Sequence, residues 1–232
     1  MRFIVSLVEN KSYYTSQTQQ KVLQELTTHP TIEEHFFLTG GTALSIFYLH
    51  HRLSEDLDFF ALDPLDLSEI DLWIRRKWLE DGVKIKESSN FLSYLINEIK
   101  VDFVIDPLSN RESREKILLE NGHSLSVDTI NNIVSNKFCT IVSRMEPKDF
   151  IDLYFIQQLF PERTIEEVYN AARTKDAIFD DPPTAAFQIE EGLDFLKENH
   201  AIFPNILRDF DLHDFFGFYN KITIWLYQQV KI

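Results

Sequence analysis

Cysteine and long apolar runs are scarce in this chain of 232 residues, and each scarcity excludes a class of protein. Cys139 is the single cysteine, so no internal disulfide can form, and such cysteine usage suits a reducing compartment. No apolar stretch approaches the roughly 20 residues that cross a bilayer, and the opening segment 1–8 is too soon interrupted for a signal peptide. We therefore expect a cytoplasmic protein with no membrane association.

Positive charge is also in short supply. The chain has 23 Lys and Arg residues against 37 Asp and Glu residues, a formal net charge of −14. Proteins that hold a nucleic-acid backbone usually present a basic face, whereas this chain as a whole repels phosphate. Two interpretations are open for a set of Lys and Arg residues, which could form a local basic patch or could be separate solvated surface charges. These residues are Arg75, Arg76, Lys77, Lys84, Lys86, Lys100, Arg111, Arg114 and Lys116. An acceptor other than RNA therefore stays an alternative.

Two of the six glycines are adjacent, between an apolar run at 36–38 and a helix-compatible segment at 43–47. This pattern predicts a strand, a turn at Gly40 and Gly41, and a helix. Glycine lets the backbone approach a ligand closely, and the free N–H groups at a helix start bind phosphate. A Walker loop requires Lys and then Ser or Thr after its glycines, where this chain has Thr42. The turn is therefore a phosphate site of another kind or, alternatively, an ordinary tight turn.

Closely spaced carboxylates follow the turn. In an extended segment Asp56, Asp58 and Phe60 lie on one face while Leu57, Phe59 and Ala61 lie on the other. Like charges this close are costly unless a cation sits between them, and Mg²⁺ prefers carboxylate, water and phosphate oxygens. Asp102 offers a third carboxylate on another β-rich segment, whereas Asp106 precedes Pro107 and marks a strand end. The alternative is a solvated strand edge.

The remaining pattern predicts an α/β (α+β) protein in two parts. We expect helices at 16–26 and 65–79 and strands at 83–86, 91–96 and 99–105 of a mixed sheet. After Pro107 we expect only helices, at 130–142, 148–159, 165–172, 184–196 and 213–230. The division is thus a mixed-sheet domain at 1–107 and a helical domain at 108–232. The aromatic residues between 203 and 227 are expected to form a core stripe or, in part, a partner surface.

Two blocks of this sequence resemble a known family. Residues 40–44 and 51–60 (Gly-Gly-Thr-Ala-Leu and His-Arg-Leu-Ser-Glu-Asp-Leu-Asp-Phe-Phe) form the first block, and residues 136–144 and 148–154 form the second. In this order, with a strand carboxylate between them, they resemble the AbiEii/AbiGii toxin family of type IV toxin–antitoxin systems, which has a polymerase-β-like nucleotidyltransferase fold. The resemblance covers roughly residues 36–160.

The resemblance implies roles for individual residues. Asp56 and Asp58, with Asp102 as the third carboxylate of the wider fold, would hold Mg²⁺ or Mn²⁺. Lys137 would contact the nucleotide phosphates, and Asp149 would support catalysis or act as a base. The implied nucleotide-binding set is Gly40, Gly41, Thr42, Arg52, Ser54 and Lys137, with Arg52 or Arg144 as a phosphate clamp. Outside the family, Lys137 and Asp149 would be exposed helix charges and Arg52 a surface cation.

These expectations combine into a metal-dependent nucleotidyltransferase. It would move a nucleoside monophosphate from a nucleoside triphosphate, such as ATP, to an acceptor, expected to be RNA and in particular the end of tRNA. Two metal ions between Asp56 and Asp58 would activate the attacking hydroxyl and neutralise the departing pyrophosphate. A cognate antitoxin is the expected partner. The alternatives are a catalytically silent nucleotide-binding or regulatory module, and an enzyme that modifies a protein or a small molecule.

Overall fold

The computed structural model describes residues 7–229 and separates into two compact units, Met1–Thr129 and Ile130–Ile232. Most of the opening segment considered as a signal peptide, and the last residue of the predicted helix 213–230, lie outside the described residues. None of the helices in the described part combines the length and hydropathy that a bilayer crossing requires.

The first unit is built on a mixed sheet. Its seven strands in the described part of the chain are β1 (Phe37–Thr39), β2 (Leu57–Ala61), β3 (Gly82–Ser88), β4 (Phe91–Ile96), β5 (Ile99–Ile105), β6 (Glu115–Leu118) and β7 (Ser124–Val127). They are ordered β3-β4-β5-β2-β1-β7-β6. The pairs β2–β5 and β1–β7 are parallel, while β1–β2, β3–β4, β4–β5 and β6–β7 are antiparallel. The mixed-sheet α/β prediction is confirmed.

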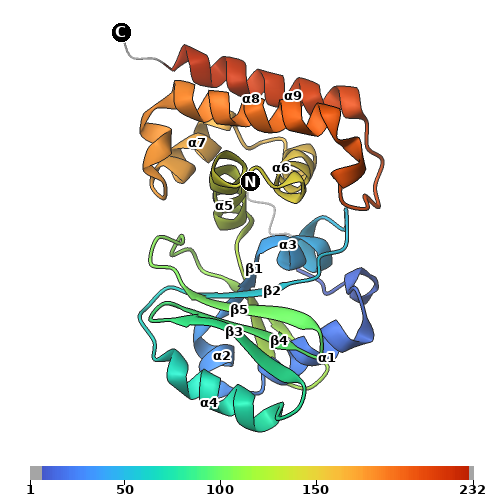
Figure 1. The fold of residues 1–232 in the computed structure, drawn as a ribbon, viewed down its shortest axis with the longest axis vertical. Coiled ribbons are helices and arrows are strands. Elements are labelled where there is room, and N and C mark those ends of the chain that lie inside the picture. The colour runs from blue at the N-terminus through green and yellow to red at the C-terminus, as the bar shows by residue number, and fades with distance from the viewer. Residues whose placement is uncertain (1–6, 230–232) are drawn as a thin grey trace. The chain divides into compact units, whose positions relative to one another are not determined.

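Alternation along the strands gives this sheet one apolar face. Leu57 and Phe59 in β2 and Phe103 in β5 are fully buried, and the rings of Phe59 and Phe103 stack at 5.5 Å. Burying one such side chain stabilises the fold by roughly 1.5–3 kcal/mol. Helices α1 (Gln17–Leu26), α2 (Pro30–His35) and α4 (Leu67–Lys77) cover this face (Figure 1). The polar residues between the apolar ones consequently point to the other face.

Two strands and one helix were missed. The prediction that only helices follow Pro107 is wrong, because β6 and β7 form a hairpin whose strand β7 pairs with β1. The first unit therefore extends to Thr129 and not to residue 107. α2 begins at Pro30, in the N1 position that favours proline.

The second unit contains only helices among its described residues. They are α5 (Ile130–Ser143), α6 (Pro147–Leu159), α7 (Ile165–Arg173), α8 (Pro182–Glu198) and α9 (Leu212–Gln228), with short 3₁₀ turns at Ala177–Asp180 and His200–Ile202. All five predicted helices are confirmed. Aromatic side chains form much of the core: Phe150 meets Tyr219 edge to face at 5.1 Å, and the Tyr219 hydroxyl donates to the Phe150 carbonyl at 2.6 Å. The predicted aromatic core stripe is thereby confirmed at Phe215 and Tyr219, which are fully buried.

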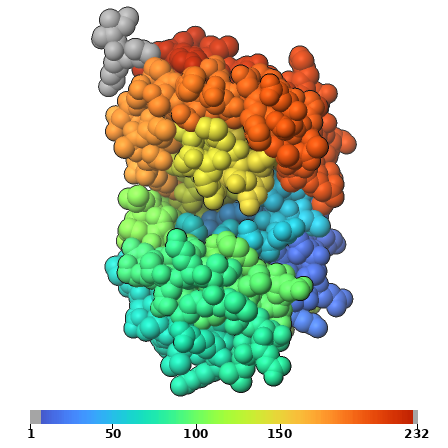
Figure 2. All heavy atoms as spheres, in the orientation of Figure 1, coloured from blue at the N-terminus to red at the C-terminus, as the bar shows by residue number. Residues whose placement is uncertain are grey.

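Six of the nine cations considered as a basic patch are held in ion pairs. Figure 2 shows α4 and the β3–β4 hairpin, in teal and green, spread over the visible face of the first unit. The pairs involving these cations are Arg75–Asp71, Lys77–Glu25, Lys84–Asp71, Lys84–Glu87, Lys100–Asp102, Arg111–Asp63 and Arg114–Asp128. Each of these six charges is offset locally by a carboxylate, which weakens any basic surface that they could form.

Candidate functional site

Gly40 brings the turn after β1 directly against the carboxylate of Asp58. Thr39 of β1 is paired with Asp58 of β2, so the turn begins beside that residue. Gly40 has φ +69°, a left-handed conformation, and a Cβ added there would lie 2.7 Å from Oδ2 of Asp58. The backbone conformation therefore favours glycine, and any larger residue would also displace the Asp58 carboxylate. The chain continues as the short helix α3 (Gly40–Ala43) and a π-helical turn (Leu44–Tyr48).

Gly41 faces the two other polar residues predicted to bind nucleotide. A Cβ added at Gly41 would lie 2.5 Å from Nη2 of Arg52 and 2.6 Å from Oγ of Ser54. Arg52 is only 3% exposed, and its Nη1 donates to the Leu53 carbonyl at 2.9 Å. The alternative interpretation of Arg52 as a surface cation is therefore wrong. A guanidinium held against a glycine turn provides positive charge where a phosphate would approach.

Hydrogen bonds fix the segment that carries Asp56. The Thr42 hydroxyl donates to the carbonyl of Asp56, and Nε2 of the fully buried Gln19 donates to the carbonyls of Ser54 and Glu55 at 2.7 and 2.9 Å. Thr42 thus ties the glycine turn to the carboxylate segment through its side chain. Thr42 was predicted to bind phosphate, and Gln19 was not predicted, because its role depends on contacts 35 and 36 residues away.

Asp58 and Asp102 are neighbours on the polar face of the sheet. The register of β2 with β5 pairs these two residues, and β4 places Ser93 on the other side of Asp102. The Ser93 hydroxyl donates to Oδ1 of Asp102 at 2.6 Å, and Lys100 Nζ donates to Oδ2 at 2.5 Å. The predicted alternation of apolar and acidic faces is confirmed, because Leu57 is fully buried and Asp56 and Asp58 are half-buried.

Lys100 sits in the field of all three predicted metal carboxylates. Burial by itself would lower the pKa of Lys100, but the hydrogen bond that Lys100 donates to Asp102 and the charges of Asp102, Asp56 and Asp58 outweigh it and raise that pKa. A group of carboxylate oxygens that already holds a cation has the donor chemistry that Mg²⁺ or Mn²⁺ requires. The residues present therefore fit a divalent ion.

A buried aspartate supports the start of the glycine turn. Asp128 is fully buried and accepts from the Thr39 hydroxyl at 2.6 Å and from Arg114 Nε at 3.0 Å. The Tyr48 hydroxyl, at the end of the π-helical turn, donates to the Asp128 carbonyl at 2.7 Å. Both ends of the segment from 39 to 48 are therefore anchored to one residue. No local pattern in the sequence indicated Asp128, because Thr39 and Tyr48 lie far from it along the chain.

Lys137 and Asp149 form a buried charge cluster in the second unit. Lys137 on α5 is 8% exposed, and its Nζ lies 2.5 Å from Oδ1 of Asp149 and 2.7 Å from Oδ2 of Asp152. Both carboxylates are fully buried, and Arg144 Nη2 lies 3.2 Å from Oδ2 of Asp149. Two cations therefore balance two carboxylates. The alternative interpretation of Lys137 and Asp149 as exposed helix charges is wrong, and Asp152 is a member of the cluster that the sequence analysis missed.

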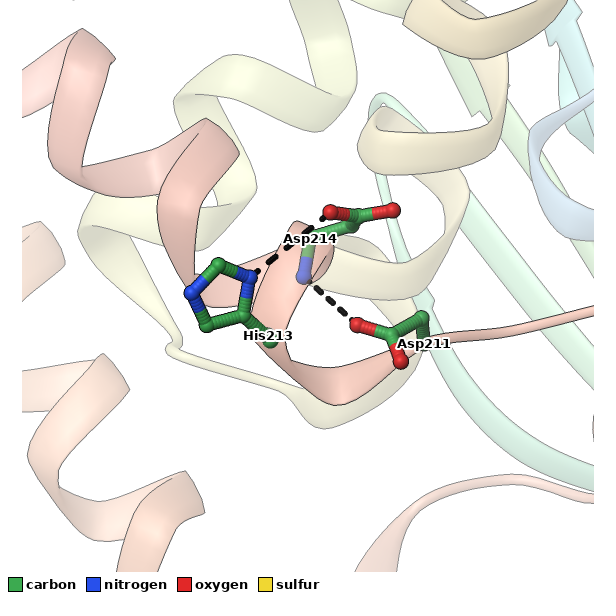
Figure 3. A group of neighbouring side chains, drawn as sticks. All are labelled: Asp211, His213 and Asp214. Carbon is green, nitrogen blue, oxygen red and sulfur yellow. Dashed lines mark hydrogen bonds and ion pairs between the residues drawn. The ribbon is translucent and has the colours of Figure 1, made fainter.

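A different acidic group lies at the start of α9. Asp211, His213 and Asp214 are close enough to suggest a metal site (Figure 3), but all three are exposed. Asp211 is the N-cap residue, and its carboxylate accepts from the Asp214 N–H at 2.9 Å. Helix capping accounts for this geometry. None of the three is among the predicted metal residues.

Replacing Gly40 with alanine should destabilise the first unit more than the same change at Gly122. Both glycines have positive φ, at +69° and +82°, but a Cβ at Gly122 meets nothing within 4 Å. We expect Gly122→Ala to cost about 1 kcal/mol from backbone strain alone, and Gly40→Ala about 2–3 kcal/mol because the methyl group also displaces Asp58. Urea unfolding of both variants measures the difference. Equal losses would contradict the close contact at Gly40.

Comparison with known proteins places these features in a family. The model of the nucleotidyl transferase AbiEii toxin of type IV toxin–antitoxin systems matches residues 21–215. An uncharacterized protein of Aquifex aeolicus (strain VF5) is 33% identical over 129 residues, which are 53% of this chain and 58% of that protein. The match thus spans little more than half of that relative's length.

Two solved structures share the fold. A Helicobacter pylori protein described provisionally as a nucleotidyltransferase aligns with a TM-score of 0.55 and 15% identity over 95% of this chain and 96% of its own. MenT4, a nucleotidyltransferase toxin of Mycobacterium tuberculosis H37Rv, aligns with a TM-score of 0.52 and 15% identity over 90% of this chain and 83% of its own. With the family model matching most of the sequence, this chain belongs to the AbiEii family of nucleotidyltransferase toxins.

Proposed function

We propose that this protein is a metal-dependent enzyme that transfers a nucleoside monophosphate from a nucleoside triphosphate to RNA. The observation that carries the proposal is the contact between the glycine turn and the carboxylates, with Gly40 packed against Asp58 and Asp58 paired with Asp102. A phosphate held by the turn would lie next to a cation held by the carboxylates. Nucleotidyl transfer requires these two elements side by side.

The reaction is an in-line displacement at the α-phosphorus. The acceptor hydroxyl oxygen bonds to this phosphorus, the bond from the phosphorus to the oxygen that bridges to the β-phosphate breaks, pyrophosphate leaves, and the hydroxyl proton passes to solvent. When bound, Mg²⁺ or Mn²⁺ supplies Lewis-acid activation of the hydroxyl and neutralises charge on the leaving group. We assign the holding of this ion to Asp56, Asp58 and Asp102.

The chain's other polar residues hold the triphosphate. We assign the backbone N–H groups of Gly41 and Thr42 to its phosphate oxygens, with Arg52 and Ser54 beside them. We further propose that Lys137 contacts nucleotide phosphates and that Asp149, which binds the Lys137 ammonium, supports catalysis by holding that charge in place. A cytoplasmic location, where nucleotides and RNA are found, and a cognate antitoxin belong to the same proposal.

One observation favours a second acceptor class. Most of the cations that would form an RNA-binding surface are paired with carboxylates, and the net charge is −14. An acidic protein attracts a cationic small molecule or a protein acceptor more readily than RNA. The transfer chemistry would be the same, because the glycine turn and the carboxylates act on the nucleotide.

A labelling experiment tests both versions. Purified protein is incubated with Mg²⁺ and each α-labelled nucleoside triphosphate, with and without total RNA, beside an Asp56→Ala/Asp58→Ala variant. We expect label in RNA only when the carboxylates are intact. Label in the protein itself would support the second acceptor class. A further incubation contains RNA together with a panel of small amines. Nucleotide binding without any transfer in that incubation would favour a silent nucleotide-binding module.

A further inference from the structure

Lys100 contacts one of the carboxylates that we assign to the metal ion. Its ammonium lies 2.5 Å from Oδ2 of Asp102, while the other oxygen of Asp102 accepts from Ser93 at 2.6 Å. Both oxygens of Asp102 are therefore engaged by groups of the protein itself. A divalent ion that takes Asp102 as a ligand has to compete with this ammonium.

The register of the strands directs the Lys100 side chain toward this site. Lys100 and Asp102 are two residues apart on β5, so their side chains leave the same face. β2 runs parallel to β5 with Leu57 opposite Val101 and Asp58 opposite Asp102. Asp56 and Lys100 are the residues just before the first of these pairs. The Lys100 ammonium therefore lies near Asp58, in β2, and near Asp56, which immediately precedes β2.

The Lys100 ammonium can also move away from Asp102. Its side chain is 41% exposed, against 12% for Asp102, so the ammonium has a path to water while the carboxylate stays in place. A lysine stem is long and flexible, and its charge is a compact point charge like that of a metal ion. The backbone that carries the carboxylates is held more firmly: strand pairing fixes Asp58 and Asp102, and the Thr42 hydroxyl donates to the backbone carbonyl of Asp56. The carboxylate of Asp102 also accepts from the Ser93 hydroxyl.

We infer that Lys100 is a resident substitute for the divalent ion: it pairs with Asp102 and offsets part of the charge of the three carboxylates in the metal-free protein, and it is displaced from Asp102 when the ion binds. This inference rests on the metal site of the proposed function and adds a residue that sets its affinity. The consequence is a site that stays ordered without metal but binds the ion less tightly than its carboxylates alone would.

Mn²⁺ binding measured without nucleotide tests this inference. The free Mn²⁺ signal in electron paramagnetic resonance gives a dissociation constant for the wild type and for Lys100→Met, Lys100→Arg and Lys84→Met. Lys84→Met is the matched control, because it removes the same charge from a lysine of the same sheet that is paired with Asp71 and Glu87. Circular dichroism confirms folding, and Lys100→Gln replaces Lys100→Met if the latter is insoluble.

We expect Lys100→Met to bind Mn²⁺ about tenfold more tightly than the wild type, because the ion no longer has to displace the partly exposed ion pair between Lys100 and Asp102. Lys100→Arg and Lys84→Met should stay within about twofold of the wild type. In the absence of metal, Lys100→Met should melt at a lower temperature than the wild type, and Mn²⁺ should restore the difference.

Unchanged or weaker Mn²⁺ binding by Lys100→Met would overturn the inference, as would an equal gain in Lys84→Met, which would reveal a general charge effect. Neither result would affect the proposed function if the wild type binds Mn²⁺ and an Asp56→Asn/Asp58→Asn variant does not. Absence of Mn²⁺ binding in the wild type and in every lysine variant would overturn the metal site and this inference together.

Discussion

Asp58→Asn is expected to lower kcat for nucleotidyl transfer by about 10³-fold or more while the first unit stays folded. The amide cannot supply the negative charge that a divalent ion requires, and an ion in such a site contributes several kcal/mol to transition-state stabilisation, or about three powers of ten in rate. The shape is nearly unchanged, so the Asn side chain still fits under Gly40. Transfer of α-labelled nucleotide under saturating substrate gives the rate.

Asp63→Asn is the control for this change. Asp63 follows β2 closely, its side chain is 72% exposed, and it pairs with Arg111 at 2.9 Å. An exposed pair of this kind contributes little to stability, so the variant should transfer nucleotide at the wild-type rate. Comparable activity of Asp58→Asn and the wild type would exclude Asp58 from the metal site, and a loss of activity in Asp63→Asn would point to an indirect effect of charge.

Lys137→Met is expected to destabilise the second unit by about 3–5 kcal/mol, because it leaves buried carboxylates without their shared cation. Asp149 and Asp152 are fully buried, and Arg144, whose Nη2 lies 3.2 Å from Oδ2 of Asp149, is itself 57% exposed. At roughly 2–4 °C per kcal/mol for a chain of this size, Tm should fall by about 10 °C. Differential scanning calorimetry measures the shift.

Two further variants separate charge from packing. Lys148→Met changes an exposed lysine of α6 and should leave Tm within about 1 °C of the wild type, since surface changes of this kind usually have small effects. Lys137→Met/Asp149→Asn/Asp152→Asn removes the unpaired charges as well and should recover most of the loss. We expect this triple variant to be folded but inactive in transfer. No recovery in the triple variant would show that the packing of the lysine stem, and not its charge, stabilises the helices.

Features encoded by local patterns were predictable from the sequence. Alternation around Leu57, Asp58 and Phe59 predicted both strand β2 and the direction of each side chain, and proline and aspartate boundaries predicted the helices after residue 130. β6 and β7 were missed because four-residue strands carry little periodicity, and three of the four residues of β6 are exposed. These strands depend on pairing with β1, which lies about ninety residues earlier.

The candidate site also contains some residues that local patterns predict and others that only distant contacts reveal. The residues within the two motifs could be identified from their order and spacing, and the structure brings Gly40, Gly41, Arg52, Ser54, Asp58 and Asp102 into contact or strand pairing in the first unit. Lys100 and Asp128 could not be assigned, because a lysine or aspartate in isolation reads as a surface charge. Only the β2–β5 register and the β1–β7 pairing reveal what they contact.

The pairing of β7 with β1 has a consequence for how the protein is made. Phe37 and Leu38 of β1 receive their second neighbour from Ser126 and Val127, while β2 is synthesised much sooner. A nascent chain that has emerged from the ribosome only to residue 107 presents β1 as an open strand edge with apolar side chains, a template for unwanted association. The sheet of the first unit can be completed only after β7 has been synthesised. Synthesis therefore passes through a stage in which the residues of the glycine turn are present but Asp128, which anchors that turn, is not.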